Sequence, residues 1–129
     1  MAILDLDGEE NARKWSEVSE AEMVEGRSYL ASAASEDGTQ IFVVGGCLSE
    51  KNSSAEVFDL SKRTWTPIAS TLTKRDSLGL ATFDGGQIYA VGGYDNNQNA
   101  YLNSVERYVC MYVCMYVCTK LYDVWEVYY

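Results

Sequence analysis

The chain has 129 residues, enough for one small domain, and 47% of them are hydrophobic, which argues against wholesale disorder. It contains no histidine, and this excludes Ser/His/Asp triads, Cys/His dyads and imidazole metal sites. Lys and Arg total 10 against 19 Asp and Glu, so the net charge of -9 disfavours nucleic acid and anionic membrane surfaces as partners. No window approaches the roughly 20 apolar residues that span a bilayer, and no secretory leader opens the sequence. We therefore expect a cytoplasmic protein.

A comparison of the chain with itself reveals an internal repeat. Shifted by 47 positions, SEDGTQIFVVGG (35–46) aligns with TFDGGQIYAVGG (82–93). Shifts of 48 and 50 positions add further matches: Arg27 with Arg75, Glu56 with Glu106, Phe58 with Tyr108, and Trp15 with Trp65. The shift changes only between matched blocks, where loops differ in length, as a repeated structural unit predicts.

In chain order, residues 1–26 read as the last two strands of one unit, within AILDLD (2–7) and KWSEV (14–18). Residues 27–74 form a complete unit, for which β-rich runs separated by turns predict four strands at about 29–34, 40–45, 54–59 and 63–69. Residues 75–108 predict the first three strands of a further unit, with a hairpin at 84–86.

Two kinds of residue have structural roles in each unit. The second strand ends in Gly45-Gly46 or Gly92-Gly93, where the lack of a Cβ permits a sharp turn and the close approach of a neighbouring backbone. The recurrence of glutamate at Glu56 and Glu106 also marks a structural position. The large side chains expected to pack one sheet on the next are Trp15, Phe58, Trp65 and Tyr108.

A period near 50 with four strands per unit is typical of a β-propeller blade. The ordered series of Arg, Asp-Gly, Ile-Tyr-Ala-Val-Gly-Gly, Asn-Ser-Val-Glu-Arg-Tyr and a following Trp resembles the kelch repeat. AVGGYD (90–95) with LNSVERY (102–108) resembles the BTB–kelch, or kelch-like, proteins. The resemblance implies an all-β fold of four-stranded antiparallel blades. About two blades are present, whereas a ring closes with roughly four to eight, so the propeller is incomplete.

Residues 109–129 depart from the repeat. Met115 stands where the first unit has Trp65, and Trp125 arrives ten residues late. YVCMYVCMYVC (108–118) repeats every four residues, and the codons TAT GTA TGT ATG encode it in every frame without a stop. We predict that 109–129 is a non-kelch tail, translated from a microsatellite or an intron. Its alternatives are an apolar strand extension and a thiolate site, although the spacing of Cys110, Cys114 and Cys118 matches no common zinc pattern.

No catalytic constellation emerges from the residues. Gly45-Gly46 is followed by Cys47 rather than by Lys-Ser/Thr, so this is no phosphate loop, and the Cys47 thiol has no imidazole base. Nothing in the sequence brings together two carboxylates among Asp76, Asp95 and Glu106. We expect a protein that is not an enzyme and uses no metal and no cofactor.

The resemblance implies a protein ligand bound on one loop face. It assigns that face to the Arg and next residue before each first strand, and to loops 47–53 and 94–103. The candidate partner-binding residues are Arg27, Ser28, Arg75, Asp76, Tyr94, Asn96, Gln98 and Asn99. For Arg27 and Arg75 the alternative is a structural ion pair between blades, and Asp76 would weaken attraction for an acidic ligand.

Three functions remain open. Resemblance to kelch-like proteins implies a substrate-recognition fragment of an adaptor for a cullin ubiquitin ligase. Cullin binding would then go through a BTB domain, which these residues lack. The alternatives are an actin-binding or cytoskeletal kelch scaffold, and an incomplete gene product without independent activity.

Overall fold

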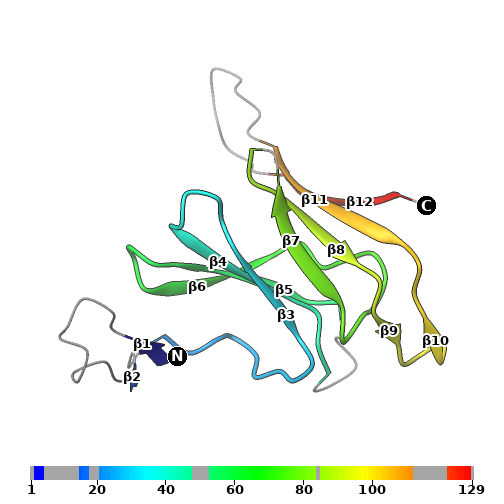
Figure 1. Ribbon diagram of the computed structural model, residues 1–129, viewed down its shortest axis with the longest axis horizontal. Coiled ribbons are helices and arrows are strands. Elements are labelled where there is room, and N and C mark those ends of the chain that lie inside the picture. Colours follow the sequence, from blue (N-terminus) through cyan, green and yellow to red (C-terminus); the bar gives the residue numbers. More distant parts are fainter. Residues whose placement is uncertain are drawn as a thin grey trace.

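The computed structural model describes residues 2–4, 15–17, 21–47, 53–83, 85–111 and 122–128 (Figure 1). These residues form strands, turns and loops, and the strands within each sheet are antiparallel. The expected all-β class is therefore confirmed. The described part has no helix long and apolar enough to cross a membrane.

The first four-stranded sheet follows the chain without a crossover. Its strands, in spatial order, are β3 (Ala31–Ala34), β4 (Gln40–Val44), β5 (Ala55–Asp59) and β6 (Thr64–Ile68). Each bound lies within two residues of its predicted position. Because neighbouring strands are antiparallel, the turns at 35–39 and 60–63 share one edge, the hairpin edge. The start of β3 and the end of β4 share the opposite edge, the loop edge.

The second sheet repeats this arrangement. Its strands are β7 (Gly79–Phe83), β8 (Gln87–Val91), β11 (Val105–Met111) and β12 (Tyr122–Tyr128), in spatial order β7-β8-β11-β12. A small hairpin of β9 (Tyr94–Asp95) and β10 (Ala100–Tyr101) lies between β8 and β11 in the chain. Near the N-terminus, β1 (Ala2–Leu4) pairs with β2 (Trp15–Glu17), so that the Trp15 backbone lies opposite Leu4.

The fourth strand of the second sheet lies where we expected a tail outside the repeat. Tyr108 pairs with Trp125 as Phe58 pairs with Trp65, but Trp125 follows its partner by seventeen positions and Trp65 by only seven. Ten more residues therefore separate the paired aromatics here, shared between longer strands and a longer connection. Lengthening a hairpin connection costs little and leaves strand register unchanged, which explains how β12 keeps its place. Residues 112–121, with two of the three tail cysteines, lie outside the described residues.

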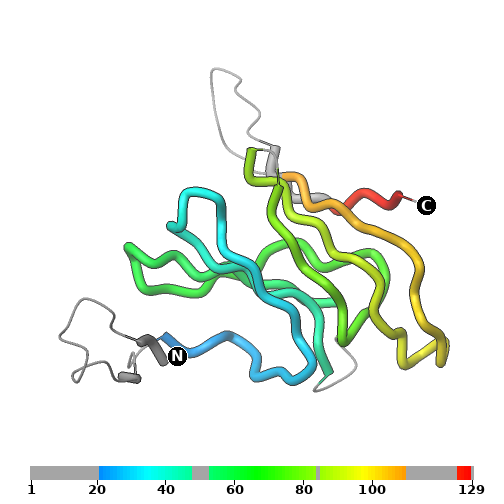
Figure 2. Tube along the Cα trace, viewed as in Figure 1, coloured from blue at the N-terminus to red at the C-terminus, as the bar shows by residue number. Residues whose placement is uncertain are grey.

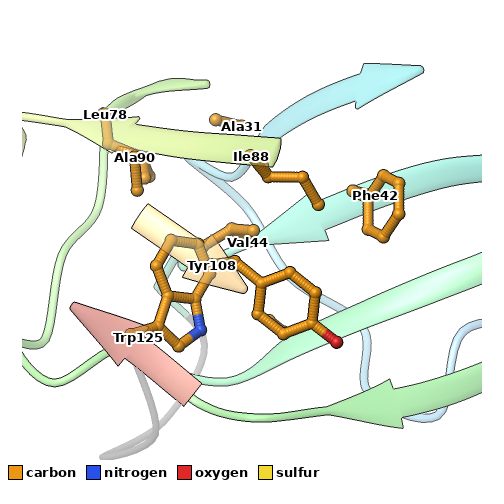
Figure 3. Close-up of a cluster of buried hydrophobic side chains, with 9 residues drawn as sticks. Ala31, Phe42, Val44, Leu78, Ile88, Ala90, Tyr108 and Trp125 are labelled. Atoms are coloured by element: carbon orange, nitrogen blue, oxygen red, sulfur yellow. The ribbon is translucent and has the colours of Figure 1, made fainter. Parts of the chain in front are cut away.

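The sheets lie side by side, with their first strands β3 and β7 in contact (Figure 2). Between them, Phe42 and Val44 of the first sheet point toward Ile88 and Tyr108 of the second (Figure 3). The ring centroids of Phe42 and Tyr108 are 6.4 Å apart. One apolar core thus spans both sheets, and Tyr108 is the one of the four large side chains expected there that belongs to it. Phe58 and Trp65 pack on each other outside this core, and the side chain of Trp15 lies outside the described residues.

The tryptophan in the fourth strand of each sheet also hydrogen-bonds to the segment that precedes that sheet in the chain. Trp65 Nε1 donates to the carbonyl of Ala21 at 3.1 Å, and Trp125 Nε1 donates to that of Ala69 at 2.9 Å. The rings of Phe58 and Trp65 pack 5.0 Å apart, and those of Tyr108 and Trp125 pack 5.5 Å apart. Trp125 therefore makes the contacts of Trp65 despite its late position in the sequence.

Candidate functional site

At the loop edge, the first residues of each loop form backbone hydrogen bonds with the segment that precedes β3 or β7. The Cys47 N–H donates to the Ser28 carbonyl at 2.7 Å, and the Tyr94 N–H donates to the Asp76 carbonyl at 2.9 Å. The Ser28 hydroxyl also donates to the Cys47 carbonyl at 2.7 Å. These bridges extend both sheets beyond their strands, so the first residues of each loop have a defined backbone position.

The paired glycines make these close approaches possible. Gly46 and Gly93 have φ values of 98° and 103°, which L side chains rarely adopt. A Cβ on Gly46 would lie 2.5 Å from the Ser28 carbonyl oxygen, and one on Gly93 would lie 2.7 Å from that of Asp76. The sharp turn and the close backbone approach expected from the sequence both occur here.

Arg27 and Arg75, the arginines that precede the first strand of each sheet, are buried in ion pairs. Arg75 Nη2 lies 2.6 Å from Glu106 Oε1, and both side chains are 0% exposed. Arg75 Nη1 donates to the Gly92 carbonyl at 2.7 Å. In the first sheet, Arg27 pairs with Glu56 in the same way.

This burial favours the structural alternative over partner contact for both arginines. Arg75 and Arg27 present no guanidinium to a partner at the loop edge, because each contacts a glutamate and backbone carbonyls. The ion pairs are structural, but each joins residues of one unit and not of two blades as the alternative expected. The signal in the sequence was the matched recurrence of Arg27 with Glu56 and of Arg75 with Glu106.

The glutamates join successive units. The Glu106 carboxylate accepts the Leu72 N–H at 2.7 Å and the Thr73 N–H at 3.0 Å. The Glu56 carboxylate accepts the Val24 N–H at 2.8 Å. Each glutamate therefore holds both its arginine and the connection that enters the sheet, which accounts for its recurrence.

An open depression of about 560 Å³ lies at the loop edge, and residues of both sheets line it. The predicted residues Asp76, Tyr94, Asn96 and Asn99 are brought together here. Of its remaining lining residues, Cys47 and Tyr101 belong to the two loops assigned to the binding face, whereas Tyr29 and Ser77 were not expected there. In the sequence, Tyr29 follows Arg27 by two positions, and Tyr101 lies within the longer loop, 94–103.

The β9–β10 hairpin is held together by its own side chains. The Asp95 carboxylate accepts the Asn97 N–H at 2.8 Å and the Gln98 side-chain amide at 2.9 Å. The rings of Tyr94 and Tyr101 pack edge to face at 5.1 Å. Gln98 is thus engaged with its own hairpin and does not line the depression, unlike the other predicted hairpin residues.

Two further hydrogen bonds orient polar groups in the depression. The Asn96 amide donates to the Asp76 carboxylate, and the Tyr94 hydroxyl donates to the Asn99 side-chain carbonyl. The depression therefore offers phenols, amides and one carboxylate in defined positions. Within the described ranges, no cluster of three or more His, Cys, Asp or Glu residues has the arrangement to hold a metal ion.

Comparison with known proteins gives consistent matches. A sequence profile of the kelch motif matches residues 29–71 and 79–111, together more than half of the chain. Kelch-like protein 25 from Rattus norvegicus and that from Mus musculus are each 39% identical to this chain over 67 residues. That segment is 52% of this chain but 11% of each relative, so the match spans about a tenth of the relatives' length.

Proposed function

The chain belongs to the kelch-repeat family, and on that premise we propose that it is a substrate-recognition part of a kelch-like adaptor for a cullin ubiquitin ligase. Kelch repeats form protein-interaction modules, and the similarity to kelch-like proteins supports that coarser role directly. The adaptor role, the cullin and a cytoplasmic location belong to the proposal.

The observation that carries the proposal is the fixed backbone at the start of each loop of the loop edge. Backbone bridges fix Cys47 against Ser28 and Tyr94 against Asp76, and buried ion pairs fix the segments that precede β3 and β7. Residues already held in place, such as Cys47 and the β9–β10 hairpin, lose little conformational entropy on binding, which favours recognition of a protein surface.

The chemistry of the depression also supports binding rather than catalysis. Its polar groups are amides, hydroxyls, a thiol and the Asp76 carboxylate, which accepts the Asn96 amide. With no histidine in the chain, the Cys47 thiol has no imidazole to activate it. We therefore propose that the protein is not an enzyme.

Precipitation of the natural protein from cells tests this proposal. We expect a cullin to co-precipitate, and we expect a photo-crosslinking residue at position 101 to capture proteins whose ubiquitylation depends on that cullin. Position 83 is the matched control, since Phe83 is also an exposed aromatic residue but lies at the hairpin edge. Absence of cullin, together with co-sedimentation of the protein with filamentous actin, would instead favour the cytoskeletal scaffold.

A further inference from the structure

We propose that the depression at the loop edge binds a cationic side chain, an arginine or a lysine, of the protein partner. The role of the partner rests on the proposed function, whereas recognition of the cation rests on the depression itself. Three features of the described residues that line the depression point to a positively charged ligand: their aromatic rings, their one carboxylate and the absence of lysine and arginine among them.

The walls of the depression are aromatic. Tyr29, Tyr94 and Tyr101 all line it, and Tyr101 is 89% exposed. The edge-to-face contact of Tyr94 with Tyr101 supports both rings. The face of a phenol ring attracts a cation, and the attraction grows as the cation loses water between several rings.

The charge of the depression is negative. Among the eight described residues that line it, Asp76 supplies the one carboxylate and none is a lysine or an arginine. Asp76 is 8% exposed, and the Asn96 amide holds its carboxylate in place. Arg75, the residue before Asp76, is buried and paired with Glu106.

The carboxylate and most of the aromatic residues of the depression come from the second unit and are not part of every repeat. Ser28 occupies the position equivalent to Asp76 in the first unit, where its hydroxyl bonds the Cys47 carbonyl. The longer 94–103 loop supplies Tyr94, Asn96 and Tyr101 to the depression. A net charge of -9 adds long-range attraction for a basic partner.

Titration of the full 129-residue chain with a matched pair of peptides tests the site. The probes are acetyl-Gly-Arg-Gly-amide and the same peptide with citrulline, which keeps the shape of arginine and removes its charge. Backbone amide shifts are followed by NMR. We expect the arginine peptide to shift the signals of residues 76–77 and 94–101, with affinity falling as salt is raised, and the citrulline peptide to shift them at least about fivefold less at equal concentration.

Variants assign the effect to the named groups. Asp76→Asn keeps the side-chain shape, and we expect it to weaken the arginine peptide at least about fivefold. Asp76→Ser, which copies Ser28 of the first unit, is expected to do the same. Tyr101→Ala should also weaken binding, whereas Asp37→Asn, at the hairpin edge, should leave it unchanged. The dispersion of amide signals reports whether each variant is folded.

Several outcomes would overturn the site. Equal shifts with the citrulline peptide, unchanged affinity in both Asp76 variants, or shifts spread over all acidic surfaces would each do so. The test is separable from that of the proposed function. Arginine binding without a co-precipitating cullin keeps this site and rejects the adaptor, while cullin binding without arginine recognition does the reverse.

Discussion

At the scale of single residues, Arg75 and Glu106 form an ion pair in which both side chains are 0% exposed. We expect Glu106→Gln to destabilise the protein by about 3 kcal/mol, because it leaves a buried guanidinium without its counter-charge. The Leu72 and Thr73 amides, which donate to this carboxylate, should exchange with solvent faster. Thermal denaturation and hydrogen exchange measure the two effects.

The matched control for this prediction is Glu126→Gln. Glu126 also pairs with an arginine, Arg107, but that pair is partly exposed on the second sheet. Solvent screens exposed pairs, so we expect a much smaller loss of stability. Equal losses in the two variants would contradict the structural role assigned to the buried pair.

Titration of Asp59 provides a second prediction at this scale. The Ser61 hydroxyl, the Lys62 ammonium and the Lys62 N–H hold the pKa of Asp59 below its ordinary value of 3.8. A depressed folded pKa means that the ionised carboxylate stabilises the fold above pH 3.8, and that this contribution is lost as pH falls through the folded pKa. The stability difference between the natural protein and Asp59→Asn should therefore shrink below pH 4.

An NMR titration of the carboxyl groups checks the cause. We expect Ser61→Ala to raise the pKa of Asp59 toward the ordinary value, since the serine hydroxyl makes the largest contribution. Asp37 is an internal reference, because Ser35 and Thr39 lower its pKa and neither is altered. A parallel rise at both aspartates would show that the variant acts through the whole fold instead.

At the scale of elements, the β11–β12 hairpin tests whether inserted length and strand pairing are independent. We expect the fold to survive when residues 110–123 are replaced by Leu-Ser-Lys-Arg, the sequence of 60–63, because this gives Tyr108 and Trp125 the spacing of Phe58 and Trp65. Trp125 fluorescence and the amide protection of β11 and β12 measure the outcome. As a control, Trp125→Ala in the same background should cost about 3–5 kcal/mol, because it removes a buried aromatic ring. Loss of β12 protection in the shortened chain would contradict the prediction.

The same hairpin shows how far sequence reasoning reaches in this fold. Strands β3 to β6 could be predicted because their alternation and turns are local in the sequence, and Gly45-Gly46 because a sharp turn needs glycine. Strand β12 could not be predicted, because the comparison of the two units assumes that the hairpin between the third and fourth strands has the same length in both. The direction of Arg75 also could not, because its partner Glu106 lies 31 positions away and both a partner contact and an ion pair suit an arginine.

The candidate site was predictable in part for the same reason. Tyr94, Asn96 and Asn99 belong to one loop, so the sequence alone groups them. Tyr29 joins them only because the first sheet lies beside the second, and this packing depends on contacts between distant segments. A depression formed between repeats becomes visible only when the repeats are placed in space.

At the scale of the whole molecule, the face of the first sheet that carries Val44 is covered by the second sheet, whereas the equivalent face of the second sheet is exposed. Val44 is 0% exposed against the second sheet, whereas Val91, its equivalent at a shift of 47, is 47% exposed. Phe83 pairs with Gln87 of β8, which lies on the same face as Val91 because side chains alternate along a strand. Phe83 therefore lies on this outward face as well, and it is 67% exposed. An apolar sheet face of this kind is stabilised when another sheet packs on it.

We therefore expect the 129-residue chain to associate with other copies as its concentration rises, through the outward face of the second sheet. Val91→Lys should reduce this association, because a lysine ammonium is costly to bury between sheets. Val24→Lys is the control, since Val24 is exposed but precedes the first sheet. Sedimentation velocity over a range of concentrations measures the effect. A single monomeric species at every concentration, or equal association in the two variants, would show that this face is stable in water without a covering sheet.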